Sequence, residues 1–122
     1  MSFDVTIFHN PNCGTSRNTL AAIREAGYQP TVVEYLKAGW TKPQLQALLK
    51  AGGLTPRDVL RVRGTPAEEL GLTNPAATDD QILEAMVAHP ILVERPIVAT
   101  PKGAVLARPM EKVFSVLETL GK

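Results

Sequence analysis

The sequence predicts an α/β fold that opens as strand-helix-strand and closes as strand-strand-helix, with a helical block between the two halves. Three observations support this prediction. A strand-like run, a helical run and a second strand-like run occupy the first 35 positions. Helix-start signals dominate the middle of the chain, and two short apolar runs flank a turn near the C-terminus.

The first half follows from local composition. Residues 3–8 are β-branched and aromatic and predict a strand, whereas 9–14 carry proline and glycine and predict a loop. A helix is expected over about 15–26, with Gly27 as its stop. Residues 31–35 form the second strand. Because a helix joins the two strands, we expect them to be parallel.

The middle of the chain is predicted to be mostly helical. A capping box with proline in the first turn, and a glycine pair at the other end, predict a helix over 41–53. A shorter helical piece is expected at 56–61 and a single turn of helix at 66–70. A second capping box predicts a helix over 78–89, which the following proline stops.

The C-terminal part returns to strands. Residues 97–99 and 104–106 are apolar and are separated by Thr-Pro-Lys-Gly, which predicts a hairpin. A last helix is expected from about Pro109, with Val113, Phe114, Leu117 and Leu120 on one apolar stripe. This order of elements is the thioredoxin-like arrangement. We therefore predict one thioredoxin-like domain over 1–122, with a helical insertion at about 38–92.

Composition narrows the function classes. The mass is 13.2 kDa, and hydrophobic residues make up 44% of the chain. Because the formal net charge is only +1, we expect no binding surface for nucleic acid or for a membrane. No apolar run reaches the length of a membrane span, and the first residues do not resemble a signal peptide. One cysteine excludes an intramolecular disulfide and suits a reducing compartment. We expect a cytoplasmic monomer.

The stretch FHNPNCGTSR at 8–17 contains that cysteine, Cys13, at the junction of the first strand and the first helix. Free N–H groups and the helix dipole favour negative charge there, which lowers the pKa of a thiol and creates an anion site. Gly14 lets a ligand approach the backbone closely. The loop is therefore a candidate site that combines a nucleophile with an anion cradle.

Two residues near Cys13, namely His9 and Ser16, each have two possible roles. His9 either stabilises the thiolate, as an imidazolium or by a hydrogen bond, or only shapes the loop. Ser16 stands where a Cys-x-x-Cys motif would have its second cysteine, and it either donates a hydrogen bond to the sulfur or caps the helix. His89 precedes a proline at a helix end and is interpreted as structural. We expect no metal site, because the two histidines and one cysteine are too far apart in the sequence.

Four arginines lie next to predicted breaks in structure: Arg17, Arg61, Arg95 and Arg108. Planar guanidinium groups bind tetrahedral oxyanions in a forked geometry. The two arginines that precede prolines are excluded from helical conformation and project from a strand start or a turn. Arg95 is the best candidate, because Pro96 occupies the position where thioredoxin-like folds place a cis-proline beside the cysteine loop.

Four motifs occur in order: HNPNCGTSRNTL at 9–20, VLRVRG at 59–64, HPILVERPIV at 89–98 and ARPMEKV at 107–113. Together they resemble the glutaredoxin-dependent arsenate reductase family, which has a thioredoxin-like fold. The resemblance runs from Phe3 to about Leu117. Longer members carry a C-terminal extension, but every motif lies upstream of Lys122, so we expect the core chemistry to be intact.

The resemblance implies a role for each matched residue. Cys13 matches the nucleophile, and His9 and Ser16 match residues that assist the thiolate. The oxyanion-binding arginines are matched by Arg61, Arg95 and Arg108, and the cis-proline by Pro96. In the family the thiolate forms an adduct with arsenate, glutathione attacks the adduct, and glutaredoxin resolves the mixed species as arsenite leaves. No bound cofactor is implied, and glutathione acts as co-substrate.

Three other functions share features with this sequence. A general glutathione-dependent thiol reductase of the same fold needs Cys13 but not three arginines. A polymerase-binding regulator of similar appearance uses Cys-x-x-Cys as its redox switch, which Ser16 removes here. A cysteine phosphatase needs arginine six positions after the cysteine, where this chain has Thr19, and is rejected.

Overall fold

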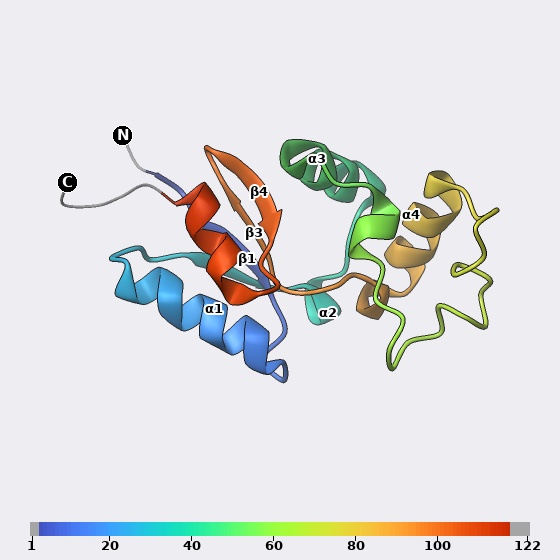
Figure 1. The fold of residues 1–122 in the computed structure, drawn as a ribbon, viewed down its shortest axis with the longest axis horizontal. Helices are drawn as coiled ribbons and strands as arrows, with labels where there is room; N and C mark the ends of the chain where they lie inside the picture. Colours follow the sequence, from blue (N-terminus) through green and yellow to red (C-terminus); the bar gives the residue numbers. More distant parts are fainter. Residues whose placement is uncertain (1–2, 118–122) are drawn as a thin grey trace. The chain divides into compact units, whose positions relative to one another are not determined.

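A computed structural model describes residues 3–117 of the chain (Figure 1). The chain divides into two compact units. The first joins the N-terminal segment that ends at Ala38 to the C-terminal segment that begins at Arg95, and the second spans Gly39–Glu94. The second unit therefore covers almost the same residues as the insertion expected at about 38–92.

The first unit is built on a four-stranded sheet with the strand order β2-β1-β3-β4. Its elements are β1 (Thr6–His9), α1 (Gly14–Glu25), β2 (Thr31–Glu34), α2 (Tyr35–Ala38), β3 (Ile97–Thr100), β4 (Gly103–Leu106) and the 3-10 helix η3 (Met110–Val116). Strand β1 pairs in parallel with β2 and antiparallel with β3, which forms a hairpin with β4. The α/β class and the parallel first pair are confirmed.

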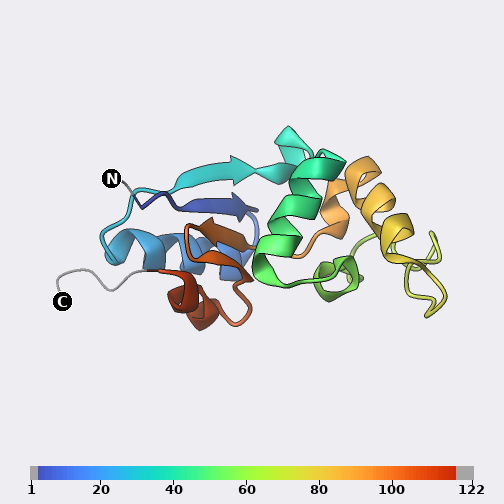
Figure 2. The same cartoon turned by 90° about the horizontal axis from the view of Figure 1, so that it is seen from above.

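The sheet register places one apolar row against the helices of this unit. Ile7 lies opposite Val98 on β3, and Val98 lies opposite Val105 on β4. Because successive strand residues point to opposite faces, these three side chains share one face. Ile7 and Val98 belong to a core with Ile23 of α1 and Val113 of η3, and Val105 packs against that core. Figure 2 shows α1 and η3 on the same side of the sheet.

The last helix differs from the expectation. It is a 3-10 helix, which has three residues per turn, so Met110, Val113 and Val116 lie on one face. Val113 and Val116 are buried, whereas Phe114 is 52% exposed. The predicted placement of Phe114 on the apolar stripe is therefore wrong, because that stripe assumed the period of an α-helix. Leu120, the last member of the stripe, lies outside the described residues.

Other boundaries shift by a few residues. Strand β1 spans Thr6–His9 rather than 3–8, and the second strand ends at Glu34. The short helix α2, which follows it directly, is not predicted by the sequence pattern. The hairpin has two loop residues, Pro101 and Lys102, because Thr100 pairs with Gly103. The strand-helix-strand and hairpin predictions are otherwise confirmed.

The second unit is helical. It contains α3 (Lys42–Gly52), the 3-10 helix η1 (Pro56–Val59), α4 (Asp79–Ala88) and the 3-10 helix η2 (Pro90–Leu92). The two predicted capping boxes are present at Thr41 and Thr78, and a third is found at Thr55. Helix α3 ends at Gly53, whose φ of 64° is the left-handed conformation that glycine adopts most easily.

The segment between η1 and α4 is held by polar contacts. The predicted single turn of helix at 66–70 is confirmed, because the Leu70 N–H donates to the Pro66 carbonyl four residues earlier. The Arg57 guanidinium donates to the carbonyls of Leu72, Asn74 and Ala77, at 3.3, 3.2 and 2.8 Å. This arginine therefore fastens the irregular segment to η1.

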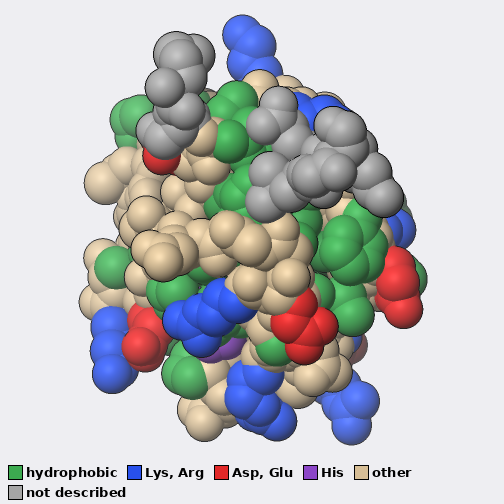
Figure 3. Space-filling model, turned by 90° about the vertical axis from the view of Figure 1, so that its left-hand side faces the viewer, with side chains coloured by type: hydrophobic (Ala, Val, Ile, Leu, Met, Phe, Trp, Pro, Cys, Tyr) green, Lys and Arg blue, Asp and Glu red, His purple; other side chains and the backbone are tan. Residues whose placement is uncertain are grey.

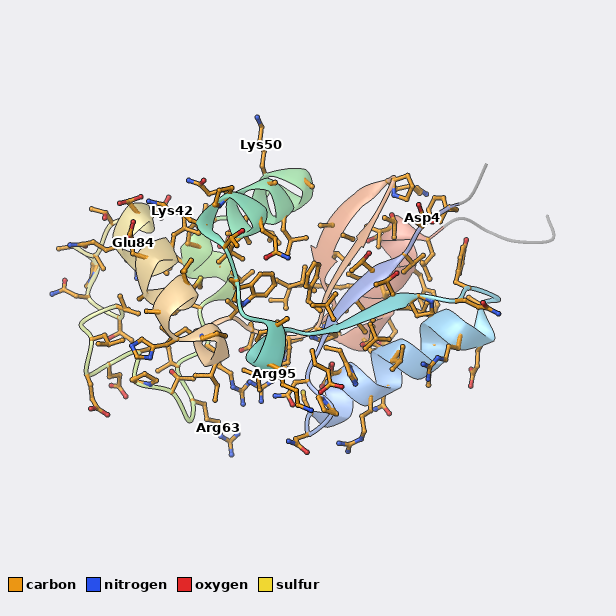
Figure 4. The ribbon with its side chains drawn as sticks, turned by 180° about the vertical axis from the view of Figure 1, so that it is seen from behind. Asp4, Lys42, Lys50, Arg63, Glu84 and Arg95 are labelled. Atoms are coloured by element: carbon orange, nitrogen blue, oxygen red, sulfur yellow. The ribbon has the colours of Figure 1, made fainter. Side chains whose placement is uncertain are left out.

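An ion-pair cluster joins the two longer helices of this unit. Lys42 at the start of α3 contacts Asp80 and, at 2.8 Å, Glu84 on α4. Figure 4 shows the Lys42 and Glu84 side chains side by side. All three side chains are substantially exposed, so we assign this cluster a small contribution to stability. Within the described residues no helix is long and apolar enough to cross a membrane.

Candidate active site

Cys13 lies in the loop that leaves the sheet at His9 and enters α1 at Gly14. It is the N-cap residue of α1, with extended torsion angles (φ −103°, ψ 123°) and no capping bond from its own side chain. Its carbonyl accepts the N–H of Arg17, and its N–H donates to the Asn10 carbonyl, both at 3.0 Å. The thiol is thus placed at the start of the helix, as predicted, and is partly exposed.

Three groups of the first unit lower the pKa of the Cys13 thiol. They are the main-chain N–H of Ser16 and the guanidinium groups of Arg95 and Arg108. Arg108 Nη1 lies 3.8 Å from Cys13 Sγ and also donates to the Arg95 carbonyl at 3.1 Å. Burial alone raises the pKa of the Cys13 thiol, but these donors outweigh it and hold that pKa below its ordinary value. The site therefore favours the thiolate.

Arg95 has unused donor capacity. Its Nε and Nη1 atoms are buried and have no hydrogen-bond partner among the described residues. A buried donor without a partner is costly, which is why such groups usually meet a ligand or water. Arg95 is labelled in Figure 4. A small anion at the thiol would satisfy these donors.

Both arginines that meet the thiol precede a proline in a cis peptide bond. The Arg95-Pro96 bond is cis, as the sequence predicts, and the Arg108-Pro109 bond is cis as well, which we did not predict. The Ala107 N–H donates to the Pro96 carbonyl at 2.9 Å. The segments before β3 and after β4 are therefore joined beside the thiol.

The side chains of His9 and Ser16 form a hydrogen bond with each other and not with the sulfur of Cys13. His9 Nδ1 lies 2.7 Å from Ser16 Oγ, and this oxygen also accepts the N–H of Asn10 at 3.0 Å. Ser16 neither caps α1 with its hydroxyl nor directs it to the sulfur, so both interpretations of that hydroxyl are corrected. The hydroxyl is occupied by these two contacts, and the group of Ser16 that lowers the pKa of the Cys13 thiol is its main-chain N–H.

The charge state of His9 follows from its surroundings. The side chain is 6% exposed, and burial is the main cause that lowers its pKa, with smaller effects from Glu34, Arg24 and Arg17. The imidazole is therefore neutral near pH 7. A neutral ring does not supply the imidazolium charge considered for the thiolate, and no contact between His9 and Sγ is found among the described residues.

The comparison with known protein families uses the pattern of residues along most of the chain. The ArsC family model matches residues 8–116. The chain belongs to the ArsC family. The match includes the cysteine loop and both arginines that meet the thiol, so the resemblance seen in the sequence is confirmed at the level of the family.

Several relatives of this ArsC family member carry the name arsenate reductase. The protein ArsI2 of Synechocystis sp. (strain PCC 6803) is 58% identical over 114 residues, which is 93% of this chain and 81% of the relative. The protein of Rhizobium meliloti is 55% identical over 113 residues, and one of Escherichia coli is 48% identical over 114, with the same shares of the two chains.

Two solved structures confirm the thioredoxin-like fold. The arsenate reductase of Vibrio cholerae superposes with a TM-score of 0.90 at 36% identity, covering 96% of this chain and 100% of the other. A putative arsenate reductase of Yersinia pestis superposes with a TM-score of 0.86 at 40% identity, covering 93% and 100%.

In this ArsC chain the first unit brings together most of the residues that the sequence singled out: His9, Cys13, Gly14, Ser16, Arg95, Pro96 and Arg108. Arg61 belongs to the second unit. There its Nη1 pairs with Glu94 Oε1 at 2.7 Å, and both side chains are about four-fifths buried (19% and 21% exposed). Arg17 donates to the Pro11 carbonyl at 2.9 Å and braces the loop.

The backbone conformation at position 14 does not require glycine. Its φ is not positive, and a Cβ built on it would meet only Arg17 Nη2, at 3.8 Å. The fold therefore tolerates a side chain here, and a role in ligand approach stays a prediction. Sequence reasoning missed Asn10 and Glu94. The Asn-x-Asn spacing before Cys13 is a turn signal that could have revealed Asn10.

Surface charge and possible metal ligands are two further features of the described residues besides the cysteine site. In Figure 3 lysine and arginine side chains are interspersed with carboxylates and apolar groups over the visible face. Among the described residues, no three histidine, cysteine or acidic side chains are grouped as ligands for a metal ion.

Proposed function

We propose that this ArsC family member reduces arsenate to arsenite, with Cys13 as the nucleophile. The observation that carries the proposal is the partly exposed thiol of Cys13, with a lowered pKa, beside Arg95 and Arg108. The buried, unpaired nitrogens of Arg95 support an anionic substrate. The names of relatives that are 45–58% identical support arsenate as that anion.

In the first proposed step, the Cys13 thiolate attacks arsenic and forms a sulfur–arsenic bond. One arsenate oxygen leaves as water after it takes up protons, and arsenic stays in the +5 state. Arg95 and Arg108 would hold the remaining oxygens and neutralise the charge that accumulates on them, because forked guanidinium groups match oxyanions well. Arg61 is proposed as the third oxyanion ligand, on the resemblance alone.

In the next steps, glutathione adds its sulfur to arsenic, and a second oxygen leaves as water. A thiol of glutaredoxin then attacks the glutathione sulfur. The sulfur–arsenic electron pair stays on arsenic, which falls from +5 to +3, and a glutathione–glutaredoxin disulfide forms. Water releases arsenite from Cys13 as the thiolate is restored. Two external thiols thus supply both electrons, which explains why one cysteine is enough.

The other predicted residues take supporting roles in this proposal. Ser16 stabilises the thiolate through its main-chain N–H, and His9 fixes the Ser16 hydroxyl. Gly14 leaves the space beside the thiol open to the substrate. The chain binds no cofactor in this scheme, meets glutaredoxin transiently and works in the cytoplasm.

The test is an NADPH-coupled assay with arsenate, glutathione, glutaredoxin and glutathione reductase. We expect turnover in the wild type and none in Cys13→Ser. A parallel arm with thioredoxin and thioredoxin reductase, and no glutathione, separates the two reductant systems. Turnover that persists in Cys13→Ser would disprove the mechanism, and turnover only in the thioredoxin arm would disprove the assigned reductant.

A second variant distinguishes arsenate reduction from a general thiol reductase. Arg95→Lys keeps the charge but loses the forked geometry, so we expect kcat for arsenate to fall by about tenfold or more while KM changes less. Reduction of a glutathione mixed disulfide by the same variant is the control, because that reaction needs no oxyanion ligand. Equal losses on both substrates would favour the thiol reductase.

A further inference from the structure

Asn10 is one of the most buried polar residues of the first unit, although no step of the proposed reaction uses it. It lies between the end of β1 and Cys13 and is 4% exposed. The buried polar residues among those described are His9, Asn10, Ser16 and Thr19, and all four lie at this junction. A buried amide is retained only where its hydrogen bonds compensate for the lost water.

Asn10 makes three hydrogen bonds, and each goes to a residue of the cysteine loop or to Ser16. Its side-chain Oδ1 accepts the N–H of Asn12 at 2.9 Å. Its carbonyl accepts the N–H of Cys13 at 3.0 Å. Its N–H donates to Ser16 Oγ at 3.0 Å. The first two bonds close a turn over residues 10–13, and the third ties that turn to α1.

These bonds control the position of the thiol. The turn sets where the Cys13 main chain enters the helix, and therefore where Sγ lies. At that position Sγ lies 3.8 Å from Arg108 Nη1. A small displacement of Sγ would lengthen this contact, and hydrogen bonds weaken steeply with distorted geometry.

We propose that Asn10 is a positioning residue, which holds Cys13 Sγ beside the Arg108 guanidinium through the turn that its side chain closes. The proposal rests on the proposed function only in taking the Cys13 thiolate as the reacting group. Serine closes a turn of the same kind more weakly, whereas alanine cannot close it. The two substitutions therefore form a graded series.

The neighbouring Asn12 offers a matched control. It is exposed, it lies in the same loop, and only its main-chain N–H takes part in the turn. Asn12→Ala therefore removes an amide of the same size from the same loop without removing the Asn10 contacts. The charged groups that face the thiol, Arg95 and Arg108, are unchanged in all the variants.

The experiment measures the rate of Cys13 alkylation by iodoacetamide against pH, with no arsenate or glutathione present. We expect the midpoint of Asn10→Ala to rise by about one pH unit relative to the wild type. Below both midpoints its rate should fall several-fold, because the smaller thiolate fraction outweighs the gain in nucleophilicity. Asn10→Ser should lie between the two, and Asn12→Ala should match the wild type.

An unchanged midpoint in folded Asn10→Ala would overturn the proposal, as would an equal shift in Asn12→Ala. Far-UV circular dichroism checks folding, and if Asn10→Ala does not fold, the midpoint of Asn10→Ser against Asn12→Ala decides. This result is separable from the proposed function. A shifted midpoint in Asn10→Ala, with a wild type that does not reduce arsenate, would leave the positioning role standing and remove the substrate.

Discussion

At the scale of single residues, burial shifts the pKa values of Cys13 and His9 in opposite directions: it raises that of the thiol and lowers that of the imidazole. Burial opposes the charged form of both Cys13 and His9. At Cys13 the Ser16 N–H and two guanidinium groups outweigh burial, so the thiolate is favoured. At His9 burial outweighs the Glu34 carboxylate, which raises the pKa, so the neutral ring is favoured. The loop therefore combines a thiol of lowered pKa with an uncharged neighbour.

The neutral state of His9 predicts how stability depends on pH. Because its pKa is lowered in the folded state, the unfolded chain takes up a proton at higher pH than the folded chain does. The free energy of unfolding should therefore fall as pH drops through the ordinary value of 6.5 towards the folded-state pKa. Urea unfolding from about pH 7.5 to about pH 5 measures this slope.

His9→Asn should flatten that slope, because an amide does not titrate. The matched control is His89→Asn, which makes the same substitution at an exposed histidine at the end of α4. If His9→Asn keeps the wild-type slope, the acid sensitivity comes from other groups and the neutral buried ring is refuted.

At the scale of elements, capping explains where the helices of the second unit begin. The side chains of three N-cap residues each accept a hydrogen bond from the main-chain N–H three residues later. The side chain at that later position accepts the main-chain N–H of the N-cap residue. The N-cap residues are Thr41, Thr55 and Thr78. Each pair satisfies two N–H groups that a helix start leaves without partners. Helix α1 lacks such a cap, because its N-cap residue is Cys13. The donors at that helix start remain available to the thiol and its ligand.

Thr78→Ala should lower the free energy of unfolding by about 1 kcal/mol, because the N–H of Gln81 loses its acceptor. Thermal unfolding followed by circular dichroism should show a decrease in Tm of about 3–6 °C. Thr73→Ala is the control, because Thr73 is exposed and belongs to none of the three capping boxes. Equal effects of the two substitutions would show that the cap contributes nothing specific.

At the scale of the whole molecule, the large exposed apolar side chains of the described residues come from both compact units. The large ones that are more than one-third exposed are Val32, Leu36, Val62, Leu70, Ile91 and Phe114. A stable interface buries about 800 Å² on each partner, with an apolar centre. Charges of both signs interrupt the apolar surface on the face that Figure 3 shows.

These features predict a monomer. Size-exclusion chromatography with light scattering, in the presence of a reductant that prevents disulfide crosslinking through Cys13, should give a mass near 13.2 kDa. Phe114→Ser, which removes the most exposed of these side chains, should elute identically. A reductant-resistant mass of twice the monomer would contradict the prediction, and a change of that mass in Phe114→Ser would locate the interface.

The sequence by itself determined the order of the strands and of the longer helices, two of the three capping boxes and the cysteine at the start of α1. These features depend on residues close together in the chain, where turn chemistry and apolar periodicity act directly. The cis bond before Pro96 came from its position in the expected fold. The period of the last helix was misjudged, because α and 3-10 helices share most of their local signals.

Only the tertiary structure decided which groups meet the sulfur. Arg108 is 95 residues from Cys13 in the sequence, and it reaches the thiol through the pairing of β1 with β3 and of β3 with β4. The Ser16 hydroxyl, which two local interpretations assigned to the helix or to the sulfur, bonds His9 and Asn10 instead. Local patterns do not encode such choices, because they depend on which long-range pairings bury each polar group and which donors remain near it.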